Sequence, residues 1–296
     1  MLETRPRVAP FVAVAIVAYC AVGMIRAASI DALSSRQSPG QHATTYLGFD
    51  RNEYPGDDAL PSLHTTFAYA GFWLNNPPGA TRNTWTGKRK MLLAHDFGFL
   101  VLFNGRLDKQ IKAASDPAAL GRADAVLAAK SAASEGFPKD TIIFLDLEEG
   151  GRMLPEQKAY IYAWVDSLTS AGFRAGIYCS GIPAPEEKGH TVVTAEDLQQ
   201  NAAGREIVFW VANDACPPSP GCSFPRQPPA PDRSRVSFAH VWQYAQSPRR
   251  PQLTRSCSPT YAQDGNCYAP GLSSTNKLFL DLNSAGEPDP SHGGTP

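Results

Sequence analysis

The segment that most constrains the fold is Ile142–Glu149, IIFLDLEE, a short apolar run that ends in acidic residues. Turn residues flank it on both sides, and this pattern predicts a buried strand of a parallel sheet. Side chains two positions apart on a strand face the same way, so we expect Asp146 and Glu148 together on one face. Burial of two acids costs several kcal/mol unless they are paired or face a solvated cleft. The pattern therefore favours a functional site over the alternative, a strand that simply ends in solvent.

Seven further strand-like runs accompany this one, and helical segments separate the first six of the eight. The predicted strands are Tyr46–Asp50, Phe67–Leu74, Phe97–Phe103, Ile142–Glu149, Arg174–Ser180, Glu206–Asp214, Phe238–Ala245 and Lys277–Asn283. Alternation of this kind indicates a parallel sheet with right-handed crossovers. Eight strands in about 240 residues predict a closed TIM-type (β/α) barrel. An open doubly wound sheet is the alternative, but its glycine-rich first turn is missing here.

The last three strands are expected to lack good helices. The stretches at 215–235 and 247–276 are rich in proline and turn residues, which disfavour regular helices. The outer ring of helices should therefore be incomplete on that side of the barrel.

The N-terminus has the pattern of an export signal. A basic start is followed by the uncharged apolar run Phe11–Met24 and by small residues, although Arg26 weakens the cleavage site. We expect residues 1–27 to be a signal peptide or an uncleaved membrane anchor, residues 28–45 a linker, residues 46–283 the barrel and residues 284–296 a disordered tail. The predicted location is secreted or periplasmic.

Cysteine usage agrees with export. Cys216 and Cys222 bracket one proline-rich loop, and Cys257 and Cys267 bracket another, so each pair could close a short disulfide. Four cysteines allow three connectivities, and the sequence does not choose among them. Cys179 lies in an apolar strand and is expected to be a buried core thiol.

Composition excludes several classes of function. The formal net charge is −1, and no basic surface for nucleic acid is indicated. The six histidines share no metal-ligand spacing, and no Walker or dinucleotide-binding motif is present. We therefore expect no metal and no cofactor.

Polar and aromatic residues gather at the predicted carboxyl ends of the strands, which form the active-site face of a barrel. The candidates are Asp50, Trp73, Asn104, Asp146, Glu148, Tyr178, Trp210, Asp214, Trp242, Tyr244 and Asp281. Carboxylates can act as acid and base at a glycosidic bond, and flat rings can stack on a sugar. This combination predicts a saccharide site.

The segments YLGFD, IIFLDLEE, AGIYCS, FWVAND, VWQYA and LFLDLN, in this order, resemble the glycoside hydrolase family 25 lysozymes. They are more similar still to bacterial glycoside-hydrolase-like barrels of unknown function. The resemblance covers about residues 46–283 and implies an eight-stranded barrel with three helix-poor strands. The resemblance implies that Glu148 is the general acid and that Asp146 stabilises positive charge. It also implies that Asp50 lines the first-strand side of the cleft, and that Asp281 either has a structural role or lies at the edge of the site.

The sequence departs from the lysozyme pattern after the first strand. Arg51, Asn52, Glu53 and Tyr54 stand where lysozymes of this type have a small polar turn. Arg51 could neutralise a neighbouring acid and lower its pKa, which would weaken that acid as a proton donor.

The sequence therefore predicts an exported, monomeric, glycosidase-like barrel that acts on a cell-wall or extracellular polysaccharide such as a peptidoglycan-like glycan. The first alternative is a non-catalytic glycan-binding barrel of the cell envelope. The second is a structural envelope protein in which the anchor and the disulfide loops matter more than the cleft. Membrane contact is expected only through an uncleaved N-terminal segment.

Overall fold

The protein is described by a computed structural model that covers residues 44–272 and 278–294. The chain divides into two units, residues 1–41 and residues 42–296, and the second contains all described residues. The expected signal peptide or anchor and almost all of the expected linker lie outside the described residues. Within the described ranges, no helix is long and apolar enough to cross a membrane.

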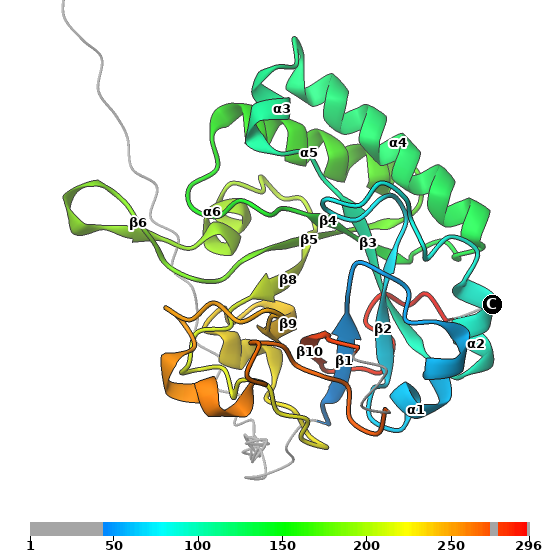
Figure 1. The fold of residues 1–296 in the computed structure, drawn as a ribbon. Coiled ribbons are helices and arrows are strands. Elements are labelled where there is room, and N and C mark those ends of the chain that lie inside the picture. The colour runs from blue at the N-terminus through cyan, green and yellow to red at the C-terminus, as the bar shows by residue number, and fades with distance from the viewer. Residues whose placement is uncertain (1–43, 273–277, 295–296) are drawn as a thin grey trace, which may run out of the picture. The chain divides into compact units, whose positions relative to one another are not determined.

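Eight strands close into a barrel, which confirms the predicted TIM-type fold class (Figure 1). Around the barrel the order is β1, β10, β9, β8, β5, β4, β3 and β2. Their bounds are β1 Tyr46–Asp50, β2 Tyr69–Trp73, β3 Gly98–Asn104, β4 Ile142–Asp146, β5 Arg174–Ser180, β8 Val208–Ala212, β9 Ala239–Ala245 and β10 Asp281–Ala285. A separate hairpin of β6 (Ala184–Pro185) and β7 (Thr191–Val192) projects from the loop after β5 (Figure 1).

The last strand differs from the prediction in position and direction. We expected it at Lys277–Asn283 in an all-parallel sheet, but β10 begins at Asp281 and runs antiparallel to both β1 and β9. An antiparallel strand needs no helical crossover, and the described residues between β9 and β10 contain no α-helix. Because of this direction, Asp281 at the start of β10 lies opposite Asp50 at the end of β1.

Two long helices, α4 (Pro117–Glu135) and α5 (Pro155–Ser170), lie side by side on one flank of the barrel (Figure 1). Asp116 accepts a hydrogen bond from the backbone N–H of Ala119 and caps the start of α4. The helices approach so closely that a Cβ on Gly121 would lie 2.1 Å from the carbonyl oxygen of Tyr160. Glycine is therefore required at this crossing.

The remaining helices are short, and the ring is incomplete where we expected it to be. They are α1 Leu60–His64, α2 Arg89–Ala94, α3 Asp108–Lys112 and α6 Thr194–Gln200, with 3-10 turns η1 Asp57–Ala59, η2 Glu187–Gly189, η3 Pro231–Ser234 and η4 Arg255–Thr260. From β8 to β10, the described residues form only 3-10 turns between strands. The last three strands are thus poor in helices, as predicted.

The C-terminal segment also differs from the expected disordered tail at 284–296. Residues 284 and 285 complete β10, and Ser291 is fully buried. The Ser291 hydroxyl accepts a hydrogen bond from Val101 N at 2.8 Å, and Asp289 accepts one from Phe99 N at 2.8 Å. The segment is ordered up to residue 294 because its side chains accept hydrogen bonds from backbone N–H groups of β3.

The disulfide connects the two proline-rich loops instead of closing each one. Cys216 bonds to Cys257, whereas Cys222 and Cys267 are free thiols. Of the pairings that the sequence left open, the structure has Cys216 with Cys257 because the loops pack against each other. A Cβ on Gly221 would lie 2.9 Å from the Cys257 sulfur. Cys179 is buried and unpaired, as expected.

Candidate active site

The carboxyl end of β4 carries the two acids that the sequence placed together. β4 is buried throughout and pairs in parallel with β3 and β5, with Asp146 in register with Asn104 and Tyr178. Asp146 is 4% exposed, whereas Glu148, just beyond the strand, is exposed. Their side chains share a hydrogen bond. The acids therefore form a pair with one member inside the barrel and the other at its more exposed rim.

The electrostatics of this pair place a proton on Asp146. Burial raises the pKa of Asp146 well above its usual range, and the nearby charges of Glu148 and Asp50 raise it further. Burial also raises the pKa of Glu148, although the hydrogen bond from Asp146 opposes that shift. These directions favour Asp146 as the member of the pair that holds a single shared proton.

Asp50 at the end of β1 is the third carboxylate of the cluster. Its Oδ1 accepts hydrogen bonds from Asn283 Nδ2 at 2.6 Å and Gln243 Nε2 at 3.0 Å. Burial raises the pKa of Asp50 to about 6, the two hydrogen bonds lower it, and the charge of Glu148 adds a smaller upward contribution. Asp50 is therefore poised to titrate near neutral pH.

A hydrogen-bond network fixes the wall between Asp50 and the Asp146–Glu148 pair. The Tyr178 hydroxyl donates to Gln243 Oε1 at 2.8 Å, and Gln246 Nε2 donates to the Tyr178 oxygen at 3.1 Å. Trp210 Nε1 donates to Asn283 Oδ1 at 2.9 Å, so the amide that binds Asp50 is itself held in place. Such a network orients the carboxylates before any ligand arrives.

These side chains enclose a cavity of about 280 Å³ at the carboxyl ends of the strands. Its lining includes Asp50, Trp73, Asp146, Glu148, Tyr178, Trp210, Gln243, Gln246 and Asp281. The structure thus brings together seven of the eleven candidates from the sequence. Trp73 and Trp210 are 4% and 1% exposed, so they form walls and not open stacking platforms.

Asp281 lies on the β10 side of this cavity. Its Oδ1 accepts a hydrogen bond from Ser247 N at 2.6 Å. Burial and the charge of Asp50 raise the pKa of Asp281 well above its usual range. A charge on Asp50 therefore favours the protonated form of Asp281, because the two acids face each other in the barrel register.

Four candidates lie outside the cavity. Asn104 holds the loop after β2 through a hydrogen bond to the Asn76 carbonyl, and it lines an adjacent cavity that Glu148 also lines. Asp214 is fully buried and forms an ion pair with Arg250. Trp242 donates to the Asn213 carbonyl, and Tyr244 donates to the Ser223 carbonyl. Asp214, Trp242 and Tyr244 thus hold the loops after β8 and do not line the cleft.

The sequence analysis did not include three amide side chains among the candidates, Gln243, Gln246 and Asn283. Gln243 lies between Trp242 and Tyr244 on β9, so its side chain points to the face of the strand that those two aromatic side chains do not occupy. Polar residues within the apolar runs VWQYA and LFLDLN were the available signal. Buried amides need partners, and here the partners are Asp50 and Tyr178.

The pKa of Asp50 is raised and not lowered, so Arg51 does not neutralise that acid. The Arg51 guanidinium lies over the Phe279 ring, 5.6 Å from its centroid. Residues 44–272 and 278–294 contain no group of three histidine, cysteine or acidic side chains arranged to hold a metal ion.

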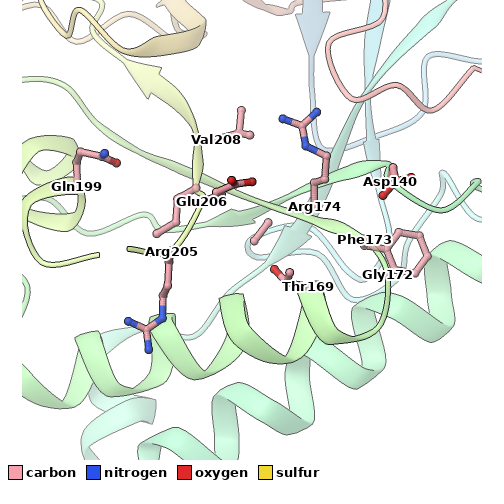
Figure 2. A pocket seen from close by; sticks show the side chains of 11 residues that line it. Asp140, Thr169, Gly172, Phe173, Arg174, Gln199, Arg205, Glu206 and Val208 are labelled. Carbon is pink, nitrogen blue, oxygen red and sulfur yellow. The ribbon is translucent and has the colours of Figure 1, made fainter. Parts of the chain in front are cut away.

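A cavity of about 640 Å³ lies at the other end of the barrel (Figure 2). Its lining includes Arg174, where β5 begins, and Val208, where β8 begins. Figure 2 shows these side chains above the C-terminal end of α5, near Thr169. Catalytic groups of such barrels lie at the carboxyl ends of the strands, so this larger cavity is not the candidate active site.

Residues 80–210 match the family described as Rv2525c-like, glycoside hydrolase-like domain. The match includes Asp146, Glu148, Tyr178 and Trp210, whereas Asp50 and Gln243 lie outside it. This finding confirms the expected resemblance to glycoside-hydrolase-like domains. No curated protein matches the chain.

Solved structures are similar in fold. An uncharacterized protein of B. stearothermophilus is 20% identical over 80% of this chain and 94% of its own, with a TM-score of 0.52. The Tat-secreted protein Rv2525c of Mycobacterium tuberculosis, in complex with HEPES, is 13% identical over 81% and 94% of the two chains, with a TM-score of 0.47. A family GH25 lysozyme from Aspergillus fumigatus is 12% identical over 82% and 94%, with a TM-score of 0.43.

Proposed function

We propose that this protein is an exported glycoside hydrolase that cleaves a cell-wall or extracellular polysaccharide by carboxylate acid catalysis. The observation that carries the proposal is the hydrogen-bonded pair of Asp146 and Glu148, with both pKa values raised, at the carboxyl ends of the strands. An acid whose pKa is raised toward the working pH is suited to donate a proton to a glycosidic oxygen. The match to a glycoside hydrolase-like family supports the same class of reaction.

In this proposal Glu148 is the general acid because it is the member of the pair that a sugar can reach. Asp146 holds the shared proton and passes it across the hydrogen bond to Glu148 as Glu148 protonates the leaving oxygen. Asp146 then becomes a carboxylate, which stabilises the positive charge that develops on the sugar ring. Buried Asp146 therefore acts both as a proton reserve and as an electrostatic partner.

Asp50 is the acid that can act on the opposite side of the sugar. Glycosidases of the two-carboxylate type separate their acids by about 5–5.5 Å or about 6.5–9.5 Å. Asp146 and Glu148 are in hydrogen-bond contact, which leaves no room for a sugar or a water between them. The opposed group in this proposal is Asp50, or else a group of the substrate itself.

Export is part of the proposal and rests on the sequence pattern of residues 1–27 together with the Cys216–Cys257 disulfide. Disulfides persist in oxidising compartments and are rare in the cytosol. We propose a secreted or periplasmic monomer, bound to a membrane only if the N-terminal segment is retained.

One observation favours a second function, a barrel that binds glycans without cleaving them. The proton of the acid pair lies on the buried Asp146, and Glu148 is the hydrogen-bond acceptor. A sugar at the exposed carboxylate would then meet a base and not an acid. If the proton cannot move to Glu148, the cleft binds a saccharide and no bond breaks.

The test is release of reducing ends from peptidoglycan and a panel of polysaccharides by the full chain. We expect release by the native protein and a loss of about 10²–10⁴-fold in Glu148→Gln, the size typical of a general acid. Glu149→Gln is the matched control, because Glu149 binds Asp108 N and does not line the cavity. Release that persists in Glu148→Gln contradicts the assignment of Glu148. Glycan binding without release by the native protein supports the binding function instead.

A further inference from the structure

We propose that a cavity beside Arg51 is a subsite for the acidic group of a saccharide, a carboxylate or a phosphate. The inference rests on the proposed function, because it concerns what the same cleft selects. It assigns Arg51 as the residue that determines this specificity. Arg51 follows the last residue of β1 directly, so the strand that positions Asp50 also positions the arginine.

The cavity adjoins the carboxylate cleft. It has a volume of about 450 Å³, and its described lining is Arg51, Asn52, Glu53, Ser247, Phe279 and Asp281. Asn52, Ser247 and Asp281 also line the cavity that contains Glu148. A saccharide that occupies the cleft can therefore place a neighbouring ring, or a substituent of the same ring, against Arg51.

The Arg51 guanidinium has unused hydrogen-bonding capacity. Its side chain is 11% exposed, and the buried Nε and Nη1 atoms have no hydrogen-bond partner among the described residues. Its contacts are the Phe279 ring and Glu53, whose Oε2 lies 4.0 Å from Nη2. Buried polar groups without partners are rare in folded proteins, and each costs free energy. An incoming oxyanion would satisfy these nitrogens.

The geometry of arginine fits such a ligand. Its planar fork of N–H groups binds a carboxylate or a phosphate through two parallel hydrogen bonds, which is stronger than a neutral contact. The Phe279 ring is 41% exposed and offers an apolar surface beside the charge. A ring with a polar substituent suits this combination better than a free inorganic ion.

The acids that face Arg51 leave its charge available. Burial lowers the pKa of Arg51, whereas the charges of Glu53 and Asp281 raise it. Burial raises the pKa of Asp281 well above its usual range, which favours the neutral form of that acid. Glu53 is 77% exposed and its Oε2 lies 4.0 Å from Arg51 Nη2, so solvent screens this interaction. The buried guanidinium of Arg51 is therefore the group of this cavity that attracts an anion, with the solvent-screened Glu53 as its nearest acid.

The experiment measures the affinity of the full chain for two pairs of saccharides by calorimetry. One pair is a galacturonic acid tetramer and its methyl ester, and the other is glucose 6-phosphate and glucose. We expect the acidic member of at least one pair to bind about tenfold tighter at low salt. The pair that responds identifies the acidic group as a carboxylate or a phosphate.

Three variants assign the preference to this cavity. Arg51→Gln should abolish it, and Glu53→Gln should increase it, because Glu53 is the exposed acid beside Arg51. Arg122→Gln is the matched control, since it removes the same charge from an exposed pair with Asp116 on α4. A preference that is absent from both pairs, or that survives Arg51→Gln, overturns the proposal.

Two further comparisons keep the test decisive if Arg51→Gln does not fold. Arg51→Lys keeps the charge and loses the fork, so it should weaken the preference without removing it. In the native protein the preference itself should fall as salt is raised. Hydrolysis without an acidic preference rejects only the subsite, and an Arg51-dependent preference without hydrolysis rejects only catalysis.

Discussion

Asp146 and Glu148 meet at the carboxyl end of β4, where burial raises the pKa of both carboxyls and the nearby charge of Glu148 raises the pKa of Asp146 further. The two acids lie two residues apart, with Asp146 at the end of β4 and Glu148 just beyond it. In this arrangement the buried Asp146 can supply a proton to the more exposed Glu148.

The raised pKa of Asp50 predicts a pH-dependent stability. Its pKa in the folded state is about 6 against a reference of 3.8, so the folded protein binds the proton more tightly than the unfolded chain. This contribution, about 3 kcal/mol, is fully present below pH 3.8 and is lost as pH rises through about 6. Urea unfolding from pH 3.5 to 7.5 should show this decline, and Asp50→Asn should remove that part of it. Parallel curves for the two proteins would contradict the prediction.

Gln243 should be important for both stability and the titration of Asp50. The side chain is 2% exposed and joins Tyr178 to Asp50. Gln243→Leu removes one hydrogen bond from Asp50 and the acceptor of the Tyr178 hydroxyl, and it should cost about 1–3 kcal/mol in the free energy of unfolding. The pKa of Asp50 should rise further, because the hydrogen bond from Gln243 lowers it.

NMR titration of the Asp50 carboxyl and urea unfolding measure the two effects of Gln243→Leu. Gln246→Leu is the matched control, since Gln246 joins the same network without a contact to a carboxylate. An unchanged pKa of Asp50 in Gln243→Leu would refute the role given to this amide.

Asp214 should act in folding and not in saccharide binding. It is fully buried and pairs with Arg250, whose side chain is 38% exposed. Asp214→Asn should destabilise the protein by about 1–3 kcal/mol, because Arg250 loses its charged partner. Asp166→Asn breaks the exposed pair with Arg205 and should have a much smaller effect. Thermal unfolding and glycan binding measured side by side test this; a binding defect at full stability would place Asp214 in the site.

The two free thiols of the loop region should form a second disulfide. Cys222 and Cys267 are in side-chain contact, and the loops that carry them are already linked by Cys216–Cys257. With oxidised glutathione as the oxidant, the two thiols lose two electrons and two protons, and glutathione is reduced. Peptide mapping should find Cys222 linked to Cys267, with a gain of about 2–4 kcal/mol in stability. Cys222→Ser is the control, and a Cys222–Cys216 link would contradict the packing of the loops.

The sequence predicted the barrel well because strand runs, helix caps and strand-end acids are local signals. It predicted β10 less well, since the direction of a strand depends on the path of the loop before it. β10 is antiparallel in the structure. This direction pairs Asn283 with Gln243 on β9 and lets its side chain donate a hydrogen bond to Asp50. Nothing local in the run LFLDLN indicates that path.

The sequence analysis also chose the wrong face of β9 for the cleft: Gln243 lines the cavity, and Trp242 and Tyr244 do not. Trp242, Gln243 and Tyr244 alternate, but the run is apolar on both faces, so the pattern does not show which face meets the cleft. Register shifts between β8 and β9 and between β9 and β10 decide the outcome. A shift of one residue exchanges the two faces of a strand.

By itself the sequence determined the strand and helix order, the closed barrel and the meeting of Asp50, Asp146, Glu148 and Tyr178. These follow from spacing along single elements and from the common edge of the strands. Only the tertiary structure decided which acid holds the proton, which amides bind Asp50, how the loops are linked and where Arg51 lies. These depend on burial and on contacts between segments far apart in the chain, which periodicity along one strand does not encode.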